Sequence, residues 1–276
     1  MKIGVDLGGT TIRCGLVDNN RVKKKLSEPC RSNRPENEVI EQLEWLISQL
    51  INPSVEGIGI GVPSVVDMQK GIVYNVVNIP SWVEVHLKDI MEAKFQLPVF
   101  VNNDSNCFAL GEHAGGVGKP FRNMLGVTLG TGVGAGVIIN NELYSGNNTG
   151  AGEIGCMPYL EHNYEYYCGS NFFVKFHGMT GKEAAQLAKA GNARALKIWE
   201  EFGKHIGVLV QAILYAFDPE AIVFGGSIAG AYPFFSAAMK ESMSAGFNYP
   251  ETIKKIQILI SNQEDISLLG AAALVK

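Results

Sequence analysis

The chain has 276 residues, 46% of them hydrophobic and 18% charged, and a formal net charge of −4. This length and composition are typical of a globular protein with a large core, in one large domain or two smaller ones. The acidic balance argues against nucleic acid as the main partner, and the single basic run, residues 23–25, is expected on an exposed strand edge.

Nothing in the sequence predicts secretion or a membrane span. Met1 leads directly into a strand, so no signal peptide is expected. The longest apolar stretch, residues 124–139, contains five glycines and is too short for a membrane helix. The five cysteines are scattered and odd in number, which favours reduced thiols in a cytoplasmic protein.

The first half of the chain begins with strands and continues with alternating helices and strands. The expected elements are strands over Ile3–Asp6, Ile12–Asp18 and Val22–Ser27, a helix over Glu36–Leu50, a strand over Gly57–Val62, a helix over His86–Phe95, a strand over Pro98–Val101 and a helix over Asp104–His113. Between residues 63 and 85 the sequence favours loops.

The second half repeats this plan, with two strands flanking a turn at Gly130 and an irregular stretch from Asn140 to about Asn171. The remaining expected elements are helices over Lys182–Lys189 and Ala193–Phe217, a strand over Ala221–Phe224, a helix over Phe234–Ala245, a strand over Lys255–Ile260 and a helix over Ile266–Val275. This order predicts an α/β fold of mixed sheets covered by helices.

The same glycine turn occurs twice, 122 residues apart, because residues 4–11 (GVDLGGTT) align without gaps on residues 126–133 (GVTLGTGV). Each turn lies between two apolar strands, which predicts a β-hairpin bent at glycines. Backbone N–H groups in such a turn can point at phosphate oxygens, so the pair favours a nucleotide held between duplicated domains. The alternative is two ordinary hairpins. Asp6, in the first copy, is a candidate for holding Mg²⁺.

Two other phosphate-binding patterns do not fit. A Rossmann site needs a helix directly after its glycines, whereas β-branched strand residues follow here. A Walker A loop needs Ser or Thr after its Gly-Lys, whereas Pro120 follows Gly118-Lys119. Any phosphate is therefore expected at the hairpins.

Asn103 and Asp104 lie between a predicted strand and a predicted helix. A carboxylate at a helix start is stabilised by the first-turn N–H groups and the helix dipole. Asp104 is therefore a candidate base that accepts the proton of a substrate hydroxyl during phosphoryl transfer. The alternative is that Asp104 only caps the helix.

Two further segments combine glycines with acidic or apolar residues. Glu153 lies between Gly152 and Gly155 and is a candidate for binding sugar hydroxyls. A strand that ends at Gly225-Gly226 is typical of a close approach between backbone and ligand. A tight turn between strand and helix explains this second segment equally well.

Taken in order, these segments resemble the ROK family of bacterial sugar kinases and repressors, within the sugar kinase, actin and heat-shock ATPase superfamily. The resemblance extends over nearly the whole chain. It implies the duplicated ribonuclease H-like fold of the actin-like ATPases, with two α/β domains and a central cleft. The expected smaller domain is 1–105 plus 262–276, and the larger one is 106–261.

The resemblance also implies ATP-dependent phosphorylation of a hexose with Mg²⁺. Asp104 then matches the catalytic base, and Asn78, Asn103 and Glu153 match sugar-binding positions. The matched nucleotide-binding positions are Asp6, Gly8, Gly9, Thr10, Thr11, Gly130, Thr131, Gly132, Gly225 and Gly226. Asp6 is expected to hold Mg²⁺ through water, and a homodimer is the family expectation. ROK repressors carry an added N-terminal helix-turn-helix, so the chain's start at the first phosphate strand favours the kinase branch.

The sequence departs from the family pattern where many members bind structural zinc. Cys156 stands at the usual His position, and the cysteine cluster is reduced to Cys168. We therefore expect no zinc site, with apolar packing in its place by four aromatic residues: Tyr166, Phe172, Phe173 and Phe176. The alternative is a zinc site built from two cysteines and two histidines: Cys156, Cys168, His162 and His177.

These departures leave the sugar open, because Cys156 and a missing Glu near residues 173–175 alter one side of the implied pocket. Ser64 stands where Gly is usual, and either donates a hydrogen bond to the sugar or fills a turn. The sequence favours a glucokinase-like enzyme acting at C6. The alternatives are a kinase for N-acetylmannosamine, N-acetylglucosamine, fructose or allose, a non-catalytic sugar sensor, and an actin-like or chaperone-like ATPase. Polyphosphate as the donor also stays open.

Overall fold

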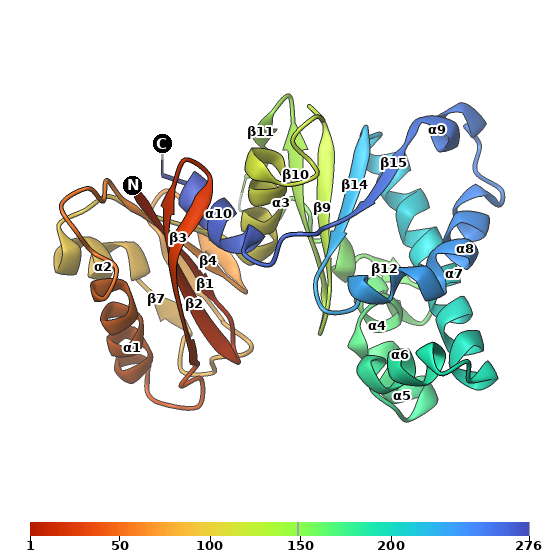
Figure 1. Ribbon diagram of the computed structural model, residues 1–276, viewed down its shortest axis with the longest axis horizontal. Helices are drawn as coiled ribbons and strands as arrows, with labels where there is room; N and C mark the ends of the chain where they lie inside the picture. Colours follow the sequence, from red (N-terminus) through yellow and green to blue (C-terminus); the bar gives the residue numbers. More distant parts are fainter. Residues whose placement is uncertain (148, 276) are drawn as a thin grey trace. The chain divides into compact units, whose positions relative to one another are not determined.

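The computed structural model describes residues 1–147 and 149–275, which form two compact units (Figure 1). Unit 1 comprises Met1–Pro120, Gly136–Ala151 and Asn262–Lys276, and unit 2 comprises Phe121–Ala135 and Gly152–Ser261. The predicted boundary at residue 105 differs from this division, because helix α3 (Asp104–Gly115) packs against helix α10 (Ile266–Ala273) within unit 1. The domain assignment of the sequence analysis stays a prediction.

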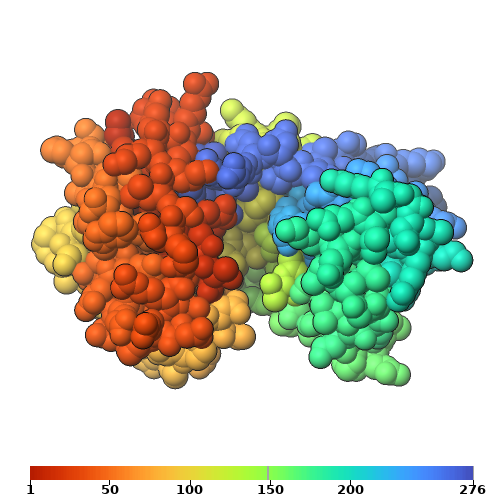
Figure 2. Space-filling model, turned by 60° about the horizontal axis from the view of Figure 1, so that its bottom comes forward, coloured from red at the N-terminus to blue at the C-terminus, as the bar shows by residue number. Residues whose placement is uncertain are grey.

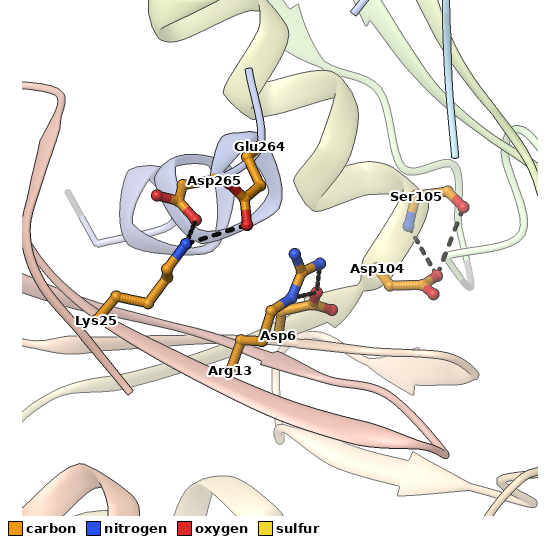
Figure 3. Close-up of polar contacts among 7 residues, drawn as sticks. All are labelled: Asp6, Arg13, Lys25, Asp104, Ser105, Glu264 and Asp265. Atoms are coloured by element: carbon orange, nitrogen blue, oxygen red, sulfur yellow. Dashed lines mark hydrogen bonds and ion pairs between the residues drawn. The ribbon is translucent and has the colours of Figure 1, made fainter. Parts of the chain in front are cut away.

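Unit 1 is built on a five-stranded sheet of order β3-β2-β1-β4-β8. Its strands are β1 (Lys2–Leu7), β2 (Thr11–Asp18), β3 (Arg21–Pro29), β4 (Ile58–Val62) and β8 (Val99–Asn103). The first three are antiparallel, as predicted, whereas β4 and β8 run parallel to β1. The basic run lies on the edge strand β3, where Lys25 Nζ lies 2.7 Å from Asp265 Oδ1 (Figure 3).

Successive residues of β1 point to opposite faces of this sheet, and the two faces pack against different helices. Ile3 and its alternate neighbours are buried in a core that they share with helix α1 (Glu36–Ser48). Gly4 and Gly59 lie on the other face, where α10 crosses the sheet; a Cβ at Gly59 would lie 2.6 Å from the carbonyl carbon of Ala271. The glycines therefore allow the backbone of α10 to lie directly on the strands (Figure 1).

The stretch predicted as loop contains three short strands that form a small antiparallel sheet. They are β5 (Val65–Asp67), β6 (Ile72–Tyr74) and β7 (Glu84–Val85), and helix α2 (Leu87–Phe95) follows them. Strands of two or three residues are too short to produce a readable alternation, which explains why the sequence analysis missed them. This sheet supports the loop that carries Asn78.

Unit 2 contains the parallel strands β9 (Met124–Leu129), β14 (Ala221–Gly225) and β15 (Gln257–Ile260). The chain leaves unit 2 within β10 (Val133–Ile139) and continues into β11 (Glu142–Leu143). The strand order β11-β10-β9-β14-β15 repeats the order β3-β2-β1-β4-β8. The duplication inferred from the two glycine turns therefore extends to the sheets.

The helices of unit 2 gather around a core of aromatic side chains. They are α4 (Tyr164–Cys168), α5 (Ser170–His177), α6 (Gly181–Lys189), α7 (Ala193–Phe217), α8 (Tyr232–Ser244) and α9 (Pro250–Lys255), with the 3₁₀ turns η1 (Ile154–Cys156) and η2 (Ala229–Ala231) and the strands β12 (Pro158–Tyr159) and β13 (His162–Asn163). Residues from about 165 to 200, green to teal, cover the face of this unit that Figure 2 shows. Helices α4 and α5 lie in or directly after the stretch that was expected to be irregular, and α9 has only six residues; none of the three was predicted.

Within the described ranges, we find no helix that combines the length and the apolar character needed to cross a membrane.

Candidate functional site

In unit 1 the predicted site residues gather at one edge of the sheet. Strands β1, β4 and β8 are parallel, so their carboxyl ends meet there. The register pairs Asp6 with Gly61 and Gly61 with Asn102, which brings the first glycine turn, Ser64 and Asp104 to that edge. Ligands of open α/β sheets bind outside the carboxyl ends of the strands.

The first glycine turn is a hairpin, as predicted. The Gly8 N–H donates to the Thr11 carbonyl at 3.0 Å, and the Cys30 N–H donates to the Thr10 carbonyl at 2.9 Å. A Cβ at Gly9 would lie 3.1 Å from Cγ of Asn78, whose side chain is exposed. The structure thus places a predicted sugar-binding residue directly on a predicted phosphate turn.

Asp6 is held by a cation that the sequence analysis missed. Arg13 lies opposite Asp6 in the β1–β2 register, and its Nε and Nη2 both donate to Asp6 Oδ2, Nε at 3.1 Å (Figure 3). The sequence could have indicated this pair, because a predicted hairpin places a basic residue directly opposite Asp6. Because Arg13 occupies Oδ2, this carboxylate suits a metal held through water better than one bound directly. Among residues 1–147 and 149–275, no group of three or more His, Cys, Asp or Glu is placed to hold a metal ion.

Asp104 is the first residue of helix α3, and the N-cap position is taken by its neighbour. Asn103 is the N-cap residue, and its Oδ1 accepts from the N–H groups of Ser105 at 2.9 Å and Asn106 at 3.3 Å. Asp104 Oδ1 accepts from the Ser105 N–H at 2.8 Å and lies 3.5 Å from Ser105 Oγ (Figure 3). Donors at a helix start stabilise the ionised form of this carboxylate, as a general base requires.

A network of asparagines fixes the corner that carries Asp104. Asn102 is only 3% exposed, and its Oδ1 accepts from the Asn103 N–H at 2.8 Å and from Asn106 Nδ2 at 2.9 Å. The sequence analysis did not assign Asn102 or Asn106, although the asparagine-rich run VNNDSN was visible. Buried amides of this kind hold a neighbouring functional side chain in one orientation.

The hydroxyl of Ser64 donates a hydrogen bond to another part of unit 1. Its Oγ donates to the Tyr74 carbonyl, and its own carbonyl accepts from Asn103 Nδ2 at 3.3 Å. Ser64 therefore joins β4, β6 and β8, which agrees with the turn-filling alternative. A contact between Ser64 and a sugar stays a prediction.

Cys107 lies beneath the two carboxylates. Complete burial raises the pKa of this thiol, and the negative charges of Asp104 and Asp6 raise it further. Burial and these two charges favour the protonated, unreactive form of the Cys107 thiol.

In unit 2 the second glycine turn and the Gly225-Gly226 segment lie side by side. The Gly130 N–H donates to the Gly132 carbonyl at 3.0 Å, which closes the turn. Gly226 has φ +84° and lies so close to β9 that a Cβ would be 2.9 Å from the Leu129 carbonyl carbon. Only glycine fits such a position, and the structure thereby brings both predicted nucleotide segments of this unit together.

The second turn is clamped by the corner between α4 and α5. Ser170 donates twice to it, from its N–H to the Gly130 carbonyl at 2.9 Å and from its Oγ to the Thr131 carbonyl at 3.2 Å. Glu165 Oε2 accepts from the Val133 N–H at 3.2 Å. The sequence analysis assigned no role to Glu165 or Ser170, because the stretch was expected to be irregular.

Glu153 immediately precedes η1 and is exposed. Its Oε2 lies 3.8 Å from Sγ of Cys156, which is also exposed. Partial burial raises the pKa of the Cys156 thiol, and the charges of Glu153 and Glu165 raise it further. Burial and both charges therefore favour the protonated form of the Cys156 thiol.

This geometry predicts the reactivity of Cys156. We expect Glu153→Gln to speed the alkylation of Cys156 by iodoacetamide, by up to about tenfold, because the thiolate is the reactive form and one pKa unit changes its population tenfold. The rate is measured by mass spectrometry at pH 7.5, with Cys30→Ser in both proteins to silence the other partly exposed thiol. Equal rates with and without Glu153 would contradict the electrostatic contact.

The four aromatic residues of α4 and α5 named in the sequence analysis pack with one another or with neighbouring rings, and the absence of zinc stays a prediction. The ring centroids of Tyr166 and Phe176 are 5.6 Å apart, and those of Phe172 and Phe173 are 5.1 Å apart. Cys168 is fully buried, whereas Cys156 is exposed, so the two cysteines of the alternative zinc site lie in different environments.

The same aromatic cluster contains a histidine that is held neutral. His205 Nδ1 lies 3.1 Å from the Tyr159 hydroxyl. Burial lowers the pKa of His205 below its ordinary value, despite the opposing charge of Glu201. Burial also raises the pKa of Tyr159 to about 12, so this hydroxyl stays protonated. Which of the two groups donates in the Tyr159–His205 hydrogen bond depends on the tautomer of the imidazole.

His205 should make stability depend on pH. Because the unfolded chain binds a proton at about pH 6.5 and the folded chain binds it only at lower pH, the free energy of unfolding should fall as the pH drops through 6.5. Urea unfolding at pH 5.5 and 7.5 measures this fall, and His205→Gln should reduce it. The control is His86→Gln, at a side chain that is 53% exposed. An equal fall in the wild type and in His205→Gln would be inconsistent with the assignment.

Comparison with known proteins finds sugar kinases and a repressor that are similar to this chain. The chain is 29% identical to a glucokinase of Halalkalibacterium halodurans, over 99% of this chain and 94% of the relative. It is 27% identical to a xylose repressor of Bacillus spizizenii, over 99% of this chain and 76% of the relative. A ROK family glucokinase from Streptomyces griseus, solved in complex with glucose and AMPPNP, superposes with a TM-score of 0.84 at 25% identity, covering 99% of this chain and 98% of that one.

These similarities confirm the α/β actin-like ATPase fold. The sequence model of the ROK family matches residues 2–172 and 173–276, which is nearly the whole chain. The chain therefore belongs to the ROK family.

Proposed function

We infer that the chain is an ATP-dependent sugar kinase, and we propose that it is a glucokinase-like enzyme that phosphorylates the C6 hydroxyl of a hexose. The observation that carries the proposal is the position of Asp104. Its carboxylate stands at the start of α3, at the same sheet edge as Asp6 and the first glycine turn. In phosphoryl transfer the protein mainly positions groups, and one carboxylate accepts the proton of the acceptor hydroxyl.

In the proposed reaction the C6 oxygen attacks the γ-phosphorus of ATP. The bond from that phosphorus to the β,γ-bridging oxygen breaks, ADP leaves, and the hydroxyl proton passes to Asp104. The asparagine network keeps this carboxylate at the sheet edge. The Ser105 N–H keeps it ionised before the proton arrives.

The two glycine turns would receive the phosphates through their backbone N–H groups. Arg13 is the cation nearest to Asp6 and would stabilise charge that develops on the transferred phosphoryl group. Mg²⁺, when bound, would neutralise the β- and γ-phosphates, with Asp6 holding it through water. Gly225 and Gly226 would lie on the adenosine side of the nucleotide.

The sugar hydroxyls are assigned to Asn78, Asn103 and Glu153, with Ser64 as a further candidate. Asn103 uses its Oδ1 as the cap of α3 and its Nδ2 on Ser64, so its sugar contact would use the remaining capacity of this amide. A cytoplasmic homodimer is part of the same proposal.

A non-catalytic sugar sensor is the second candidate, because one relative is named a xylose repressor. A sensor needs neither a base nor a group that holds Mg²⁺. The presence of Asp104 with its helix-start donors, and of the Asp6–Arg13 pair, favours the kinase.

A coupled assay of ADP release tests the proposal. The panel contains Mg·ATP with glucose, mannose, fructose, allose and the N-acetylhexosamines, and polyphosphate as a second donor. Turnover that is fastest on glucose supports the glucokinase assignment, and turnover on another sugar keeps the kinase but changes its substrate. Sugar binding without turnover on any member of the panel would favour the sensor.

A further inference from the structure

The two glycine turns carry different side chains. At the first turn, the group against Gly9 is the neutral amide of Asn78. At the second turn, a Cβ at Gly132 would lie 2.8 Å from the carboxyl carbon of Glu165, so a carboxylate lies directly on the backbone. The carboxylate beside the first turn, Asp6, is paired with Arg13, whereas the second turn carries the carboxylate of Glu165 directly on its backbone.

Glu165 is built into the second turn. Its Oε2 accepts the Val133 N–H at 3.2 Å, and Asn163 caps α4 by accepting from the Tyr166 N–H at 2.9 Å, which fixes the helix that carries Glu165. Ser170 holds the turn from the other side through the Gly130 and Thr131 carbonyls. No ion pair compensates Glu165 within the part of the chain that the structure describes.

A carboxylate at this position has a definite effect on a polyphosphate ligand. It repels phosphate oxygens that carry their full negative charge, and it repels a metal complex of the same phosphates much less, because the cation offsets the charge.

We propose that Glu165 is a specificity-determining residue that makes the second glycine turn select the magnesium complex of ATP over metal-free ATP. The inference rests on the proposed function, which places nucleotide phosphates at this turn. Glu165 is a positioning and selecting group and takes no part in the transfer itself. Metal-free ATP that approaches this turn meets the carboxylate of Glu165, which already accepts the Val133 N–H.

Calorimetric titration of the full chain tests the proposal without turnover. ATP is titrated in the absence of sugar, once with EDTA and once with excess MgCl₂, at matched ionic strength. Glu165→Gln removes the charge but retains an oxygen that accepts the Val133 N–H. We expect this variant to bind metal-free ATP about tenfold more tightly and Mg·ATP with little change. Glu161→Gln, an identical change at an exposed residue of the same unit, should alter neither affinity.

The possible results distinguish a failure of the role of Glu165 from a failure of the kinase proposal. Unchanged binding of metal-free ATP to Glu165→Gln, or an equal gain for both forms, overturns the inference and leaves the kinase proposal intact. A wild-type chain that binds neither form of ATP overturns the kinase proposal and the inference together. Glu165→Ala, which removes the charge and the hydrogen bond, should shift the ratio of the two affinities in the same direction; a ratio like that of the wild type would count against the role of charge.

Discussion

Asp104→Asn should lower kcat for hexose phosphorylation by about 10²–10⁴-fold, the range typical of removing a general base. The asparagine retains an oxygen that accepts the Ser105 N–H at the start of α3, so the helix and the sheet edge should keep their structure. The amide cannot take the proton of the sugar hydroxyl. The coupled assay measures kcat, and calorimetry measures the sugar affinity, which should stay close to that of the wild type.

A matched control separates this effect from the loss of one negative charge. Asp89→Asn makes the same change in helix α2, at a side chain that is 71% exposed, and should leave kcat unchanged. A kcat for Asp104→Asn equal to that of the wild type would remove Asp104 from the role of base. A parallel loss of sugar affinity and kcat would instead give it a role in binding.

Gly270→Ala should destabilise the protein by about 3 kcal/mol, at the upper end of the range for overpacking. Helices α3 and α10 cross so closely that a Cβ at Gly270 would lie 2.6 Å from the carbonyl carbon of Cys107 and 2.7 Å from the Gly111 N. Both obstacles are backbone atoms, so the helices must separate. Asp104 begins α3, and the shift should therefore also reduce kcat.

Gly230→Ala is the control for this prediction, because a Cβ at Gly230 meets no atom within 4 Å. Urea unfolding, followed by circular dichroism, compares the two variants with the wild type. The control should change the free energy of unfolding by less than about 0.5 kcal/mol. Equal unfolding midpoints for the two variants would show that the helix crossing tolerates a methyl group.

Much of the architecture was accessible from the sequence, because long elements carry periodic patterns. The hairpins around both glycine turns, helix α7 and the strands leading to Asp104 and Gly225 all follow from alternation, helical spacing and glycine placement. The short strands β5 to β7 were missed, since two or three residues give too little pattern, and the helices α4 and α5 were missed because that stretch was expected to be irregular.

The candidate site could be predicted from the sequence only in part, for a different reason. Residues at the ends of strands could be assigned from motifs, but their partners come from neighbouring elements and have no fixed spacing. Arg13 faces Asp6 across a hairpin, Glu165 reaches the second turn from a helix 32 residues beyond Val133, and Asn103 takes the cap that was considered for Asp104. Such contacts depend on register and helix packing, which sequence patterns specify poorly.

The position of α10 on Gly4 and Gly59 has a consequence for how the protein is made. The face of the sheet under α10 contains Gly4, whereas the helix that covers it follows more than 260 residues later in the chain and is synthesised after unit 2. At a synthesis rate of about 20 residues per second, the delay between Gly4 and Leu268 is about 13 s. Unit 1 is therefore completed only after all of unit 2 has left the ribosome, and until then this face of the nascent sheet is exposed to chaperones and to other unfinished chains.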